Sequence, residues 1–406
     1  MYSNRRPLTP ERIHPLKILL LAPQPFYRER GTPIAVRLLA ETLCALGHAV
    51  DLLVYHEGEE ISYPGLRLLR AAAPPLVREV PIGFSAKKLA CDIFLTVSFL
   101  RLARAGRYDV VHAVEEAIFP AAWLRGRHGA AIVCDMDSDM VDQIVGTSRL
   151  RGRFRRPLDA IVRHALGACR LVLAVCPSLA DKAQALCPAV PVRVLEDIPL
   201  TEAPHAPVED LRSLFGIYGP LALYVGNLEP YQGIDLLLEA MGELGAAPPV
   251  TLVVIGGSPE DVARYRNKAE RGGLTRLVHF AGARPVRSLG GYLAQADILV
   301  SPRTLGENTP MKIYSYLAAG NSILATAIGS HTQALDDSCA LLVRPDPGSL
   351  AAGLRRLAAD PELRRRLGGA GAARAAERYS RAAYREKLRA AYALLEPKPC
   401  GPGGPA

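Results

Sequence analysis

A polar loop within residues 301–312 runs into a short helix that carries a lysine in its first turn. Arg303 in the loop, Lys312 in the helix and the unpaired amides at the helix start are groups that could hold a diphosphate. A lysine in a first turn opposes the helix dipole, which indicates an anion nearby. Glu307 lies just before the helix, where its carboxylate could accept hydrogen bonds from sugar hydroxyl groups. The alternative is a solvated loop with incidental charges.

The helix after this loop has start and stop signals in the sequence. Thr309 is predicted to be the N-cap, Pro310 the first helical residue and Gly320 the stop. The predicted helix is therefore about ten residues long.

Two further loops in the first half of the chain have compositions that suit a binding site. Gly31 lies between a predicted strand and a predicted helix with Thr32 as its N-cap, so a ligand could approach the backbone there. Asp135, Asp137 and Asp139 follow another predicted strand and resemble a short Asp-x-Asp metal site. An ordinary strand-to-helix turn explains the first loop and a capped turn the second. We favour the capped turn and expect no metal.

A cluster of basic residues precedes a helical stretch predicted over residues 158–166. The cluster consists of Arg149, Arg151, Arg153, Arg155 and Arg156. With apolar residues between them, these arginines could bind anionic lipid headgroups at roughly 1 kcal/mol per charge. The alternative is a solvated basic face. The net charge of +9 also suggests anionic partners, but no zinc-finger or RNA-binding aromatic motif is present, and we expect no nucleic acid partner.

The elements that position these loops alternate between short apolar runs and helix-like stretches. Strands that are apolar throughout are buried on both faces, which is typical of a parallel sheet covered by helices. Loops after such strands lie where α/β folds bind ligands, and Glu115 follows one of them. The predicted strands are 17–22, 49–56, 110–113, 130–134, 171–175, 221–225, 251–255, 278–280, 298–301, 322–325 and 340–343.

A chain of 406 residues is long enough for two domains. The apolar pattern is lost between residues 188 and 220, and the domain boundary is predicted near residue 205. We expect Rossmann-like domains over 1–205 and 206–380, a helix over 381–395 and a disordered tail over 396–406. Eight cysteines without paired spacing, no signal peptide and no apolar run of about 20 residues predict a cytoplasmic protein, at most peripheral to a membrane.

Residues 224–240 and 306–326 resemble the phosphate-binding segment and the Glu-x7-Glu signature of the retaining glycosyltransferases of family 4, and 343–380 resembles the family's tail. The resemblance implies a GT-B fold, with two facing Rossmann-like domains and a C-terminal helix that crosses back to the first. It also implies a hexosyltransferase-like enzyme that uses a UDP- or GDP-linked sugar without a metal ion or other cofactor. The implied role is surface polysaccharide or glycolipid synthesis at the inner face of a membrane.

The chain departs from the family pattern at four positions. Asn227 and Gln232 stand where an arginine and a lysine normally hold the donor diphosphate, and Ser315 stands where a second glutamate holds the ribose. Asp137 stands where the first domain normally has a histidine, while the first glutamate of the signature is kept as Glu307. We interpret this as a rewired site in which Arg303 and Lys312 replace the missing cations.

The resemblance and the loops together give a set of candidate site residues. The donor-binding candidates are Gly31, Asn227, Gln232, Arg303, Asn308, Thr309, Lys312 and Ser315. The catalytic candidates are Glu307 and Asp137, with Asp135 and Glu115 on the acceptor side. Two other functions stay open. The chain could be a catalytically silent GT-B scaffold, or a metal-dependent enzyme that uses the three aspartates.

Overall fold

The chain divides into two compact units in a computed structural model. Unit 1 comprises Met1–Ala174, Ala180–Arg193 and Arg385–Ala406, and unit 2 comprises Val175–Leu179 and Val194–Tyr384. The structure describes residues 14–27, 31–75, 77, 80, 85–141, 151–200, 207–245 and 250–395, except the side chains of 151–154. The predicted tail over 396–406 lies outside the described residues.

Unit 1 is built on a sheet of seven strands in the order β3-β2-β1-β4-β5-β6-β7. The pairings from β3 to β6 are parallel, and the central strands are buried along their length. The strands are β1 (Lys17–Leu21), β2 (Ala49–Val54), β3 (Leu66–Arg70), β4 (Val110–Val114), β5 (Ala131–Met136), β6 (Leu171–Ala174) and β7 (Val192–Val194). The sequence predicted all except β3 and β7. These two are the edge strands, whose residues are mostly half-exposed and so lack a continuous apolar run.

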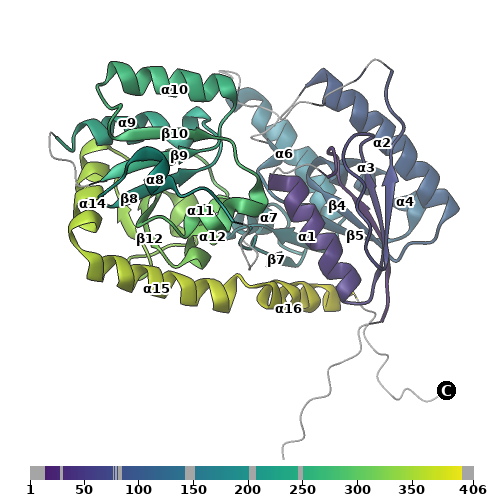
Figure 1. Cartoon of the computed structure of the whole chain (residues 1–406). Helices are drawn as coiled ribbons and strands as arrows, with labels where there is room; N and C mark the ends of the chain where they lie inside the picture. Colours follow the sequence, from purple (N-terminus) through teal and green to yellow (C-terminus); the bar gives the residue numbers. More distant parts are fainter. Residues whose placement is uncertain are drawn as a thin grey trace, which may run out of the picture. The chain divides into compact units, whose positions relative to one another are not determined.

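Helices connect these strands, as Figure 1 shows. They are α1 (Gly31–Ala45), α2 (Ala86–Ala105), α3 (Ile118–Trp123), α4 (Arg125–His128), α6 (Arg151–Gly167) and α7 (Pro177–Leu186), with a short 3-10 turn η1 (Glu115–Ala117). The prediction that Thr32 is an N-cap is wrong, because α1 already includes Gly31 and Thr32 lies inside its first turn.

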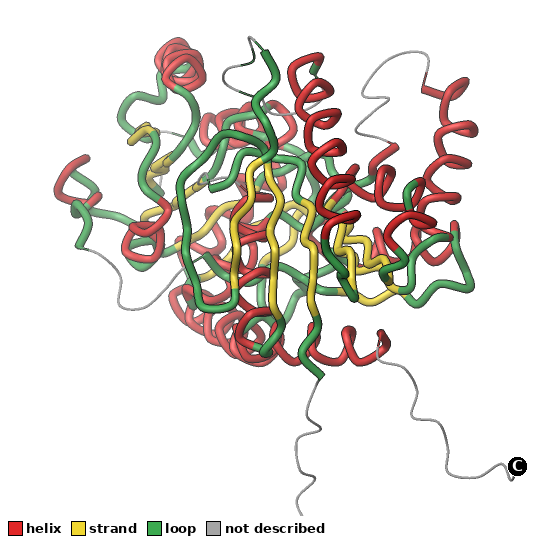
Figure 2. The backbone as a smooth tube through the Cα atoms, turned by 90° about the vertical axis from the view of Figure 1, so that its right-hand side faces the viewer, coloured by secondary structure: helices red, strands yellow, loops and turns green. Residues whose placement is uncertain are grey.

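Unit 2 has a six-stranded sheet in the order β10-β9-β8-β11-β12-β13, parallel throughout. The strands are β8 (Leu221–Val225), β9 (Thr251–Ile255), β10 (Val278–Gly282), β11 (Ile298–Ser301), β12 (Ser322–Thr326) and β13 (Leu341–Val343). All six were predicted, because each is a short apolar run between flanking turns. Four of them are buried along almost their whole length, whereas β10 and β13 are largely half-buried. Figure 2 shows strands of the protein side by side in yellow with helices in red beside them.

The sheet of unit 2 is flanked by helices on both faces, and apolar side chains from both sides form two core clusters. The helices are α8 (Leu211–Phe215), α9 (Ile234–Gly242), α10 (Pro259–Arg271), α11 (Leu289–Leu293), α12 (Met311–Ala319), α13 (Gly329–Thr332), α14 (Pro347–Ala359) and α15 (Pro361–Arg378). The 3-10 turns are η2 (Pro230–Gln232) and η3 (Val286–Ser288).

The C-terminal helix α16 (Arg381–Tyr392), followed by the turn η4 (Ala393–Leu395), returns to unit 1. The hydroxyl of Tyr392 lies 2.7 Å from Nδ1 of His112 on β4, and both side chains are fully buried. The predicted crossing of this helix back to the first domain is confirmed.

The chain enters unit 2 earlier than the sequence suggested. β7 ends at Val194, and the backbone amide of Leu200 already donates a hydrogen bond to Ser315 of α12, at 2.9 Å. The chain therefore passes into unit 2 at Val194, before the stretch around residue 205 that lacks an apolar pattern.

Within the described residues, no helix is both long and apolar enough to cross a bilayer. The seven described cysteines are free thiols, and all except Cys44 are buried.

Candidate functional site

The strand order of unit 2 reverses between β8 and β11. Parallel sheets bind ligands at such a switch point, beyond the carboxyl ends of the strands. Gly226 follows β8 there, and the loop that holds Arg303 and Glu307 follows β11. The topology thus brings together two segments that lie about 80 residues apart in the sequence, as the bond between Gln232 and Lys312 shows.

Lys312 occupies this place from the first turn of α12. Its Nζ atom lies 3.0 Å from Oε1 of Gln232 and 4.0 Å from the centre of the Tyr224 ring. Gly226 makes room for it, because a Cβ atom there would lie 2.6 Å from Nζ. Gly226 also has φ near +150°, a value that side-chain-bearing residues rarely adopt. The Tyr224 ring was not predicted, because its position in an apolar strand indicates only a core residue.

No carboxylate in the described part of the chain lies within ion-pair distance of Lys312 or Arg303. Burial, and then the neighbouring Arg303, hold the pKa of Lys312 well below its usual value. A buried cation without a counter-charge is costly unless an anion completes the site. This pair of cations is therefore the best candidate for an anion-binding centre.

Arg303 is placed differently from the prediction. Its guanidinium is buried and donates hydrogen bonds to the carbonyl oxygen of Leu305 at 2.6 Å, to that of Asn308 at 3.0 Å and to Oδ1 of Asn308 at 3.2 Å. Burial lowers its pKa. Arg303 therefore shapes the loop, and its charge acts on the site at a distance while Lys312 is the cation that faces it.

The arginine holds the loop in a tight path around Gly306. Gly306 has φ near +124°, and a Cβ atom there would lie 2.0 Å from Nη2 of Arg303. The carbonyl oxygen of Glu307 accepts a hydrogen bond from Nε2 of Gln333 at 2.7 Å and one from Oγ of Ser178 at 3.3 Å. Because the main chain is fixed in this way, the exposed side chain of Glu307 starts from a defined position.

The helix start was predicted one residue too early. α12 begins at Met311, its N-cap is Pro310, and Thr309 makes no capping bond. Ser315 is fully buried, and its hydroxyl accepts the Leu200 amide. Its predicted contact with a ribose stays a prediction that this geometry disfavours, because the hydroxyl is already bonded inside the protein.

Of the two uncharged replacements, Gln232 is buried and positions Lys312, whereas Asn227 is exposed on the loop after β8. The carbonyl oxygen of Asn227 accepts the Tyr224 hydroxyl at 2.6 Å. This bond fixes the loop between β8 and α9.

His331 supports the loop that follows β11, and no local pattern in the sequence predicted it. Its imidazole is fully buried, with Nε2 2.9 Å from Oγ of Ser301 and Nδ1 2.8 Å from the carbonyl oxygen of Thr326. Oγ1 of Thr326 in turn donates to the carbonyl oxygen of Arg303 at 2.5 Å. Burial lowers the pKa of His331 to about 4, so the ring is neutral at pH 7 and adds no charge beside Lys312.

Unit 1 has its own cluster beyond β4 and β5, beside the switch between β1 and β4. Glu115 is buried, and Oγ of Ser138 lies 2.9 and 3.0 Å from its two carboxylate oxygens. Its φ of 53° makes it the one non-glycine residue with positive φ in the described part of the chain. Such backbone strain often marks a functional site. Burial, opposed by the Ser138 bond and assisted by Asp135, raises the pKa of Glu115 to about 8.

The three aspartates after β5 separate into different roles. Oδ2 of Asp135 lies 3.7 Å from Nε2 of His112, and Asp137 is half-buried next to Ser138. Asp139 pairs with Lys182 at 2.9 Å and accepts the Val141 amide at 2.9 Å, as a capped turn would. Within the described residues, no three His, Cys, Asp or Glu side chains form a metal site.

The remaining predicted residues are less informative. Gly31 is the first residue of α1, and its φ is not positive. Its backbone conformation therefore does not require a glycine. Arg149 lies outside the described residues, and the side chains of Arg151 and Arg153 are not described. Arg156 is exposed, and Arg155 lies 3.9 Å from Asp139 and from Asp159.

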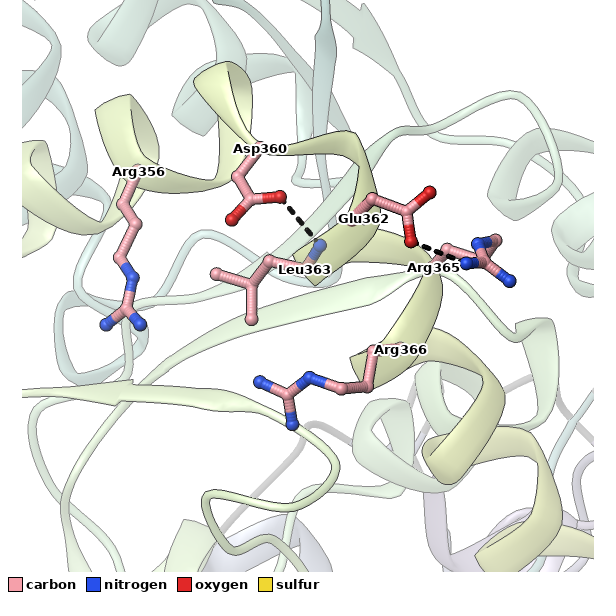
Figure 3. A pocket seen from close by; sticks show the side chains of 6 residues that line it. All are labelled: Arg356, Asp360, Glu362, Leu363, Arg365 and Arg366. Atoms are coloured by element: carbon pink, nitrogen blue, oxygen red, sulfur yellow. Dashed lines mark hydrogen bonds and ion pairs between the residues drawn. The ribbon is translucent and has the colours of Figure 1, made fainter.

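A shallow hollow between α14 and α15 lies elsewhere in unit 2 (Figure 3). There Asp360 accepts the Leu363 amide at 2.9 Å, and Glu362 pairs with Arg365 at 2.5 Å. Its acidic groups thus cap and brace α15, and it does not lie at a strand end.

The two halves of the chain match known families. Residues 30–196 match the family model described as Glycosyltransferase Family 4, and residues 219–360 match that described as Glycosyl transferases group 1. The chain belongs to the group 1 and family 4 glycosyltransferases. The predicted resemblance is confirmed.

Curated relatives include inositol-directed enzymes. A D-inositol 3-phosphate glycosyltransferase of Corynebacterium jeikeium is 31% identical over 183 residues, 43% of each chain. A phosphatidyl-myo-inositol mannosyltransferase of Mycobacterium leprae is 27% identical over 158 residues, 38% of this chain and 41% of the other. The chain therefore spans about two fifths of the length of the curated relatives it matches.

Solved glycosyltransferase structures share the whole fold. Sucrose-phosphate synthase from Thermosynechococcus elongatus superposes with a TM-score of 0.75 and 23% identity, covering 94% of this chain and 99% of the other. Anabaena HepE in complex with UDP-glucose has a TM-score of 0.69 and 16% identity, covering 93% and 99%. The GT-B fold is thereby confirmed.

Replacing Gly306 with alanine should destabilise the loop, because φ near +124° is strained for alanine and its Cβ would overlap the Arg303 guanidinium. We expect the free energy of unfolding to fall by roughly 1–3 kcal/mol. Gly242→Ala is the matched control, since a Cβ in that helical position meets no atom within 4 Å. Equal stability of the two variants in denaturant titrations would contradict this account of the loop.

His331 predicts a pH-dependent stability. Its pKa is about 4 in the folded chain and about 6.5 when unfolded, so the unfolded chain binds the extra proton between these values. The stabilisation is present above pH 6.5 and is lost as the pH falls to 4, by about 3 kcal/mol. In denaturant melts over this range, the loss should be smaller by that amount in His331→Asn. An unchanged loss would show that the buried ring is protonated.

Proposed function

We propose that the chain transfers a sugar from a nucleoside-diphosphate donor to a glycan or lipid-linked acceptor. The single observation that carries this is Lys312, a cation at the switch point of unit 2 without a carboxylate partner in the described residues. A diphosphate supplies the missing negative charge. The fold supports the choice of ligand, since Anabaena HepE has the same fold and its structures contain UDP and UDP-glucose.

The donor diphosphate would sit against Nζ of Lys312 and the first amides of α12. That helix has no acidic residue in its first turn, so its positive end is not neutralised from within. When the bond from the sugar to the diphosphate breaks, charge grows on the leaving oxygen, and these groups stabilise it. Because these groups already stabilise the leaving charge, we infer a reaction that needs no metal ion. Retention of configuration is what the family resemblance implies.

Glu307 would orient the transferred sugar. Its side chain is exposed, and its main chain is held by Gln333 and Ser178. An exposed carboxylate on a fixed backbone can accept hydrogen bonds from sugar hydroxyl groups without moving the loop.

On the acceptor side we place Glu115, Asp135 and Asp137. With a pKa near 8, Glu115 is largely protonated at pH 7 and donates a hydrogen bond, so it orients an acceptor oxygen. The acceptor oxygen forms the new bond to the sugar, and its proton leaves toward Asp137, the carboxylate that replaces the family's histidine.

The names of the relatives and the charge of the chain support a proposal for the acceptor class. The relatives named above act on inositol phosphate or phosphatidyl-inositol by their names. We propose a role in surface polysaccharide or glycolipid synthesis on the cytoplasmic side of a membrane, with Arg155 and Arg156 near anionic headgroups.

A silent scaffold is the second candidate. Gln232 accepts a bond from Lys312 and Arg303 is bonded to its own loop, so both groups are partly satisfied without a ligand. In that case the chain would neither transfer the sugar nor hydrolyse the donor, and the second experiment below, which measures these activities, separates the two functions.

Lys312→Met should weaken binding of UDP or GDP by roughly 10–100-fold, the loss of one charge-assisted interaction. Calorimetric titration without added metal measures this directly. Lys268→Met is the matched control. Lys268 lies on α10, and its Nζ atom pairs with Asp235 of α9 at 2.5 Å. If neither nucleotide binds the unmodified chain, the proposed function fails.

Glu307→Gln should lower kcat for sugar transfer or donor hydrolysis about 100-fold while the nucleotide Kd stays within about threefold, because this carboxylate holds the sugar and not the diphosphate. Glu362→Gln, which changes another exposed glutamate on α15, should leave both unchanged. Activity should survive EDTA, and its loss there would favour the metal-dependent alternative.

A further inference from the structure

One buried histidine of unit 1 has no part in the reaction proposed above. His112 lies at the centre of β4, and its side chain is fully buried. Among the described residues, its Nε2 atom has no hydrogen-bond partner. Most buried polar atoms in proteins are hydrogen-bonded, and one that is not requires an explanation. The surroundings of this atom therefore indicate what the histidine does.

The pairing of β4 with β5 directs His112 toward Asp135. His112 pairs with Val133 and Val114 pairs with Asp135, and alternate residues of a strand share a face. His112 and Asp135 therefore project from the same face of the sheet, with Asp135 closer to the carboxyl ends of the strands. Nε2 of His112 lies 3.7 Å from Oδ2 of Asp135. The side chain of Asp135 is 16% exposed, so it connects the buried imidazole with the acceptor side of the site.

The other nitrogen of the imidazole faces the C-terminal helix α16. The Tyr392 hydroxyl lies 2.7 Å from Nδ1 of His112, and the two ring planes are inclined by 25° with their centres 6.1 Å apart. The imidazole of His48 stacks on the same tyrosine, with an angle of 29° and a distance of 5.6 Å. Leu388 and Ala391 lie on the same buried face of α16, so packing sets the position of Tyr392.

The tyrosine determines which nitrogen of His112 carries the hydrogen. Burial, and then the charge of Asp135, hold the pKa of Tyr392 well above its usual value, so the hydroxyl keeps its proton. When this hydroxyl donates to Nδ1 of a neutral imidazole, the ring hydrogen lies on Nε2, on the side of Asp135. An N–H directed at a carboxylate forms a charge-assisted hydrogen bond. At 3.7 Å this bond is still open, and such contacts commonly tighten when a substrate binds.

We propose that Tyr392 and His112 are positioning residues that orient Asp135 toward the acceptor hydroxyl. The C-terminal helix then contributes to the acceptor side of unit 1 through three side chains, which belong to α16, β4 and β5. The use of Asp135 by an acceptor rests on the proposed function, whereas its orientation by His112 does not.

The neighbouring Glu115 gives this orientation a purpose. Burial first, and then the charge of Asp135, raise the pKa of Glu115 to about 8, so its carboxyl group is a hydrogen-bond donor at pH 7. A hydroxyl group of the acceptor can donate one hydrogen bond and accept another. With Glu115 as donor and Asp135 as acceptor, the same hydroxyl is held from two sides, provided that the Asp135 side chain is fixed.

Nitrogen-15 NMR of the full chain tests the orientation without a substrate. The parent should contain His112 as a neutral ring with its hydrogen on Nε2, and its signals are assigned by their loss in His112→Gln. In Tyr392→Phe, which removes only the hydroxyl, the hydrogen should be shared between the two nitrogens. A hydrogen on Nδ1 or on both nitrogens in the parent, or a tautomer that Tyr392→Phe leaves unchanged, would overturn the proposal.

Hydrolysis of a donor measures the consequence, because water then takes the place of the acceptor. With UDP-glucose or GDP-mannose as the probe, Tyr392→Phe and His112→Leu should each lower kcat about tenfold, the effect of one hydrogen bond. The Kd of the nucleotide should stay within about threefold, because Lys312 and α12 belong to unit 2. His112→Gln keeps an N–H group that can reach Asp135 and should retain most of the activity.

Tyr108→Phe is the matched control. Tyr108 is another buried tyrosine of unit 1, and its hydroxyl donates to Oδ2 of Asp51 at 2.6 Å. It precedes the amino end of β4, whereas Asp135 lies toward the carboxyl ends of the strands. The control should therefore lose a comparable hydrogen bond and keep both kcat and Kd.

The results separate this proposal from the proposed function. A parent chain that hydrolyses neither donor and binds no nucleotide contradicts the proposed function, and the tautomer measurement still decides whether Tyr392 and His112 orient Asp135. A kcat in Tyr392→Phe equal to that in Tyr108→Phe would contradict the positioning role. Equal losses of activity and of thermal stability in His112→Gln and His112→Leu would assign His112 to packing alone.

Discussion

The uncompensated charge of Lys312 is the constraint on which the site of unit 2 depends. An ammonium group at a strand end, with no carboxylate beside it in the described residues, is tolerated only where other groups share its cost. Gln232 supplies an oxygen, the Tyr224 ring supplies its electron-rich face and Gly226 leaves the space. His331 stays neutral because it is buried, so a third positive charge is avoided. Each of these features makes sense if an anion is the intended partner.

Arg303 affects Lys312 and the loop around it without facing the proposed ligand. Its guanidinium donates three hydrogen bonds to its own loop, and its charge lowers the pKa of Lys312. The loop is thereby rigid before a ligand arrives, and Glu307 is presented on it. A rigid loop spends less binding energy on ordering itself, which is the usual advantage of preorganised sites.

In unit 1, burial changes the pKa of a carboxyl group. Glu115 is buried at the end of β4 in a strained backbone conformation, and Ser138 spans both of its oxygens. Its raised pKa makes it a hydrogen-bond donor near neutral pH, whereas the nearby Asp139 is neutralised by Lys182. Carboxyl groups close in sequence thus acquire distinct roles from their surroundings alone.

The sequence by itself determined the fold class and the strands of unit 2, and it predicted Lys312 and Glu307 as candidate site residues. Short apolar runs and the punctuation by glycine and proline are local signals, and a lysine in a first turn is visible without coordinates. The edge strands β3 and β7 were not predicted, because their half-exposed residues do not form a continuous apolar run. Only the tertiary structure decided that Arg303 donates hydrogen bonds to its own loop and that the Ser315 hydroxyl accepts the Leu200 amide. It also decided that His331 and Gln333 support the site. The physical reason is that hydrogen-bond partners and burial depend on residues distant in the chain, which a local pattern does not contain.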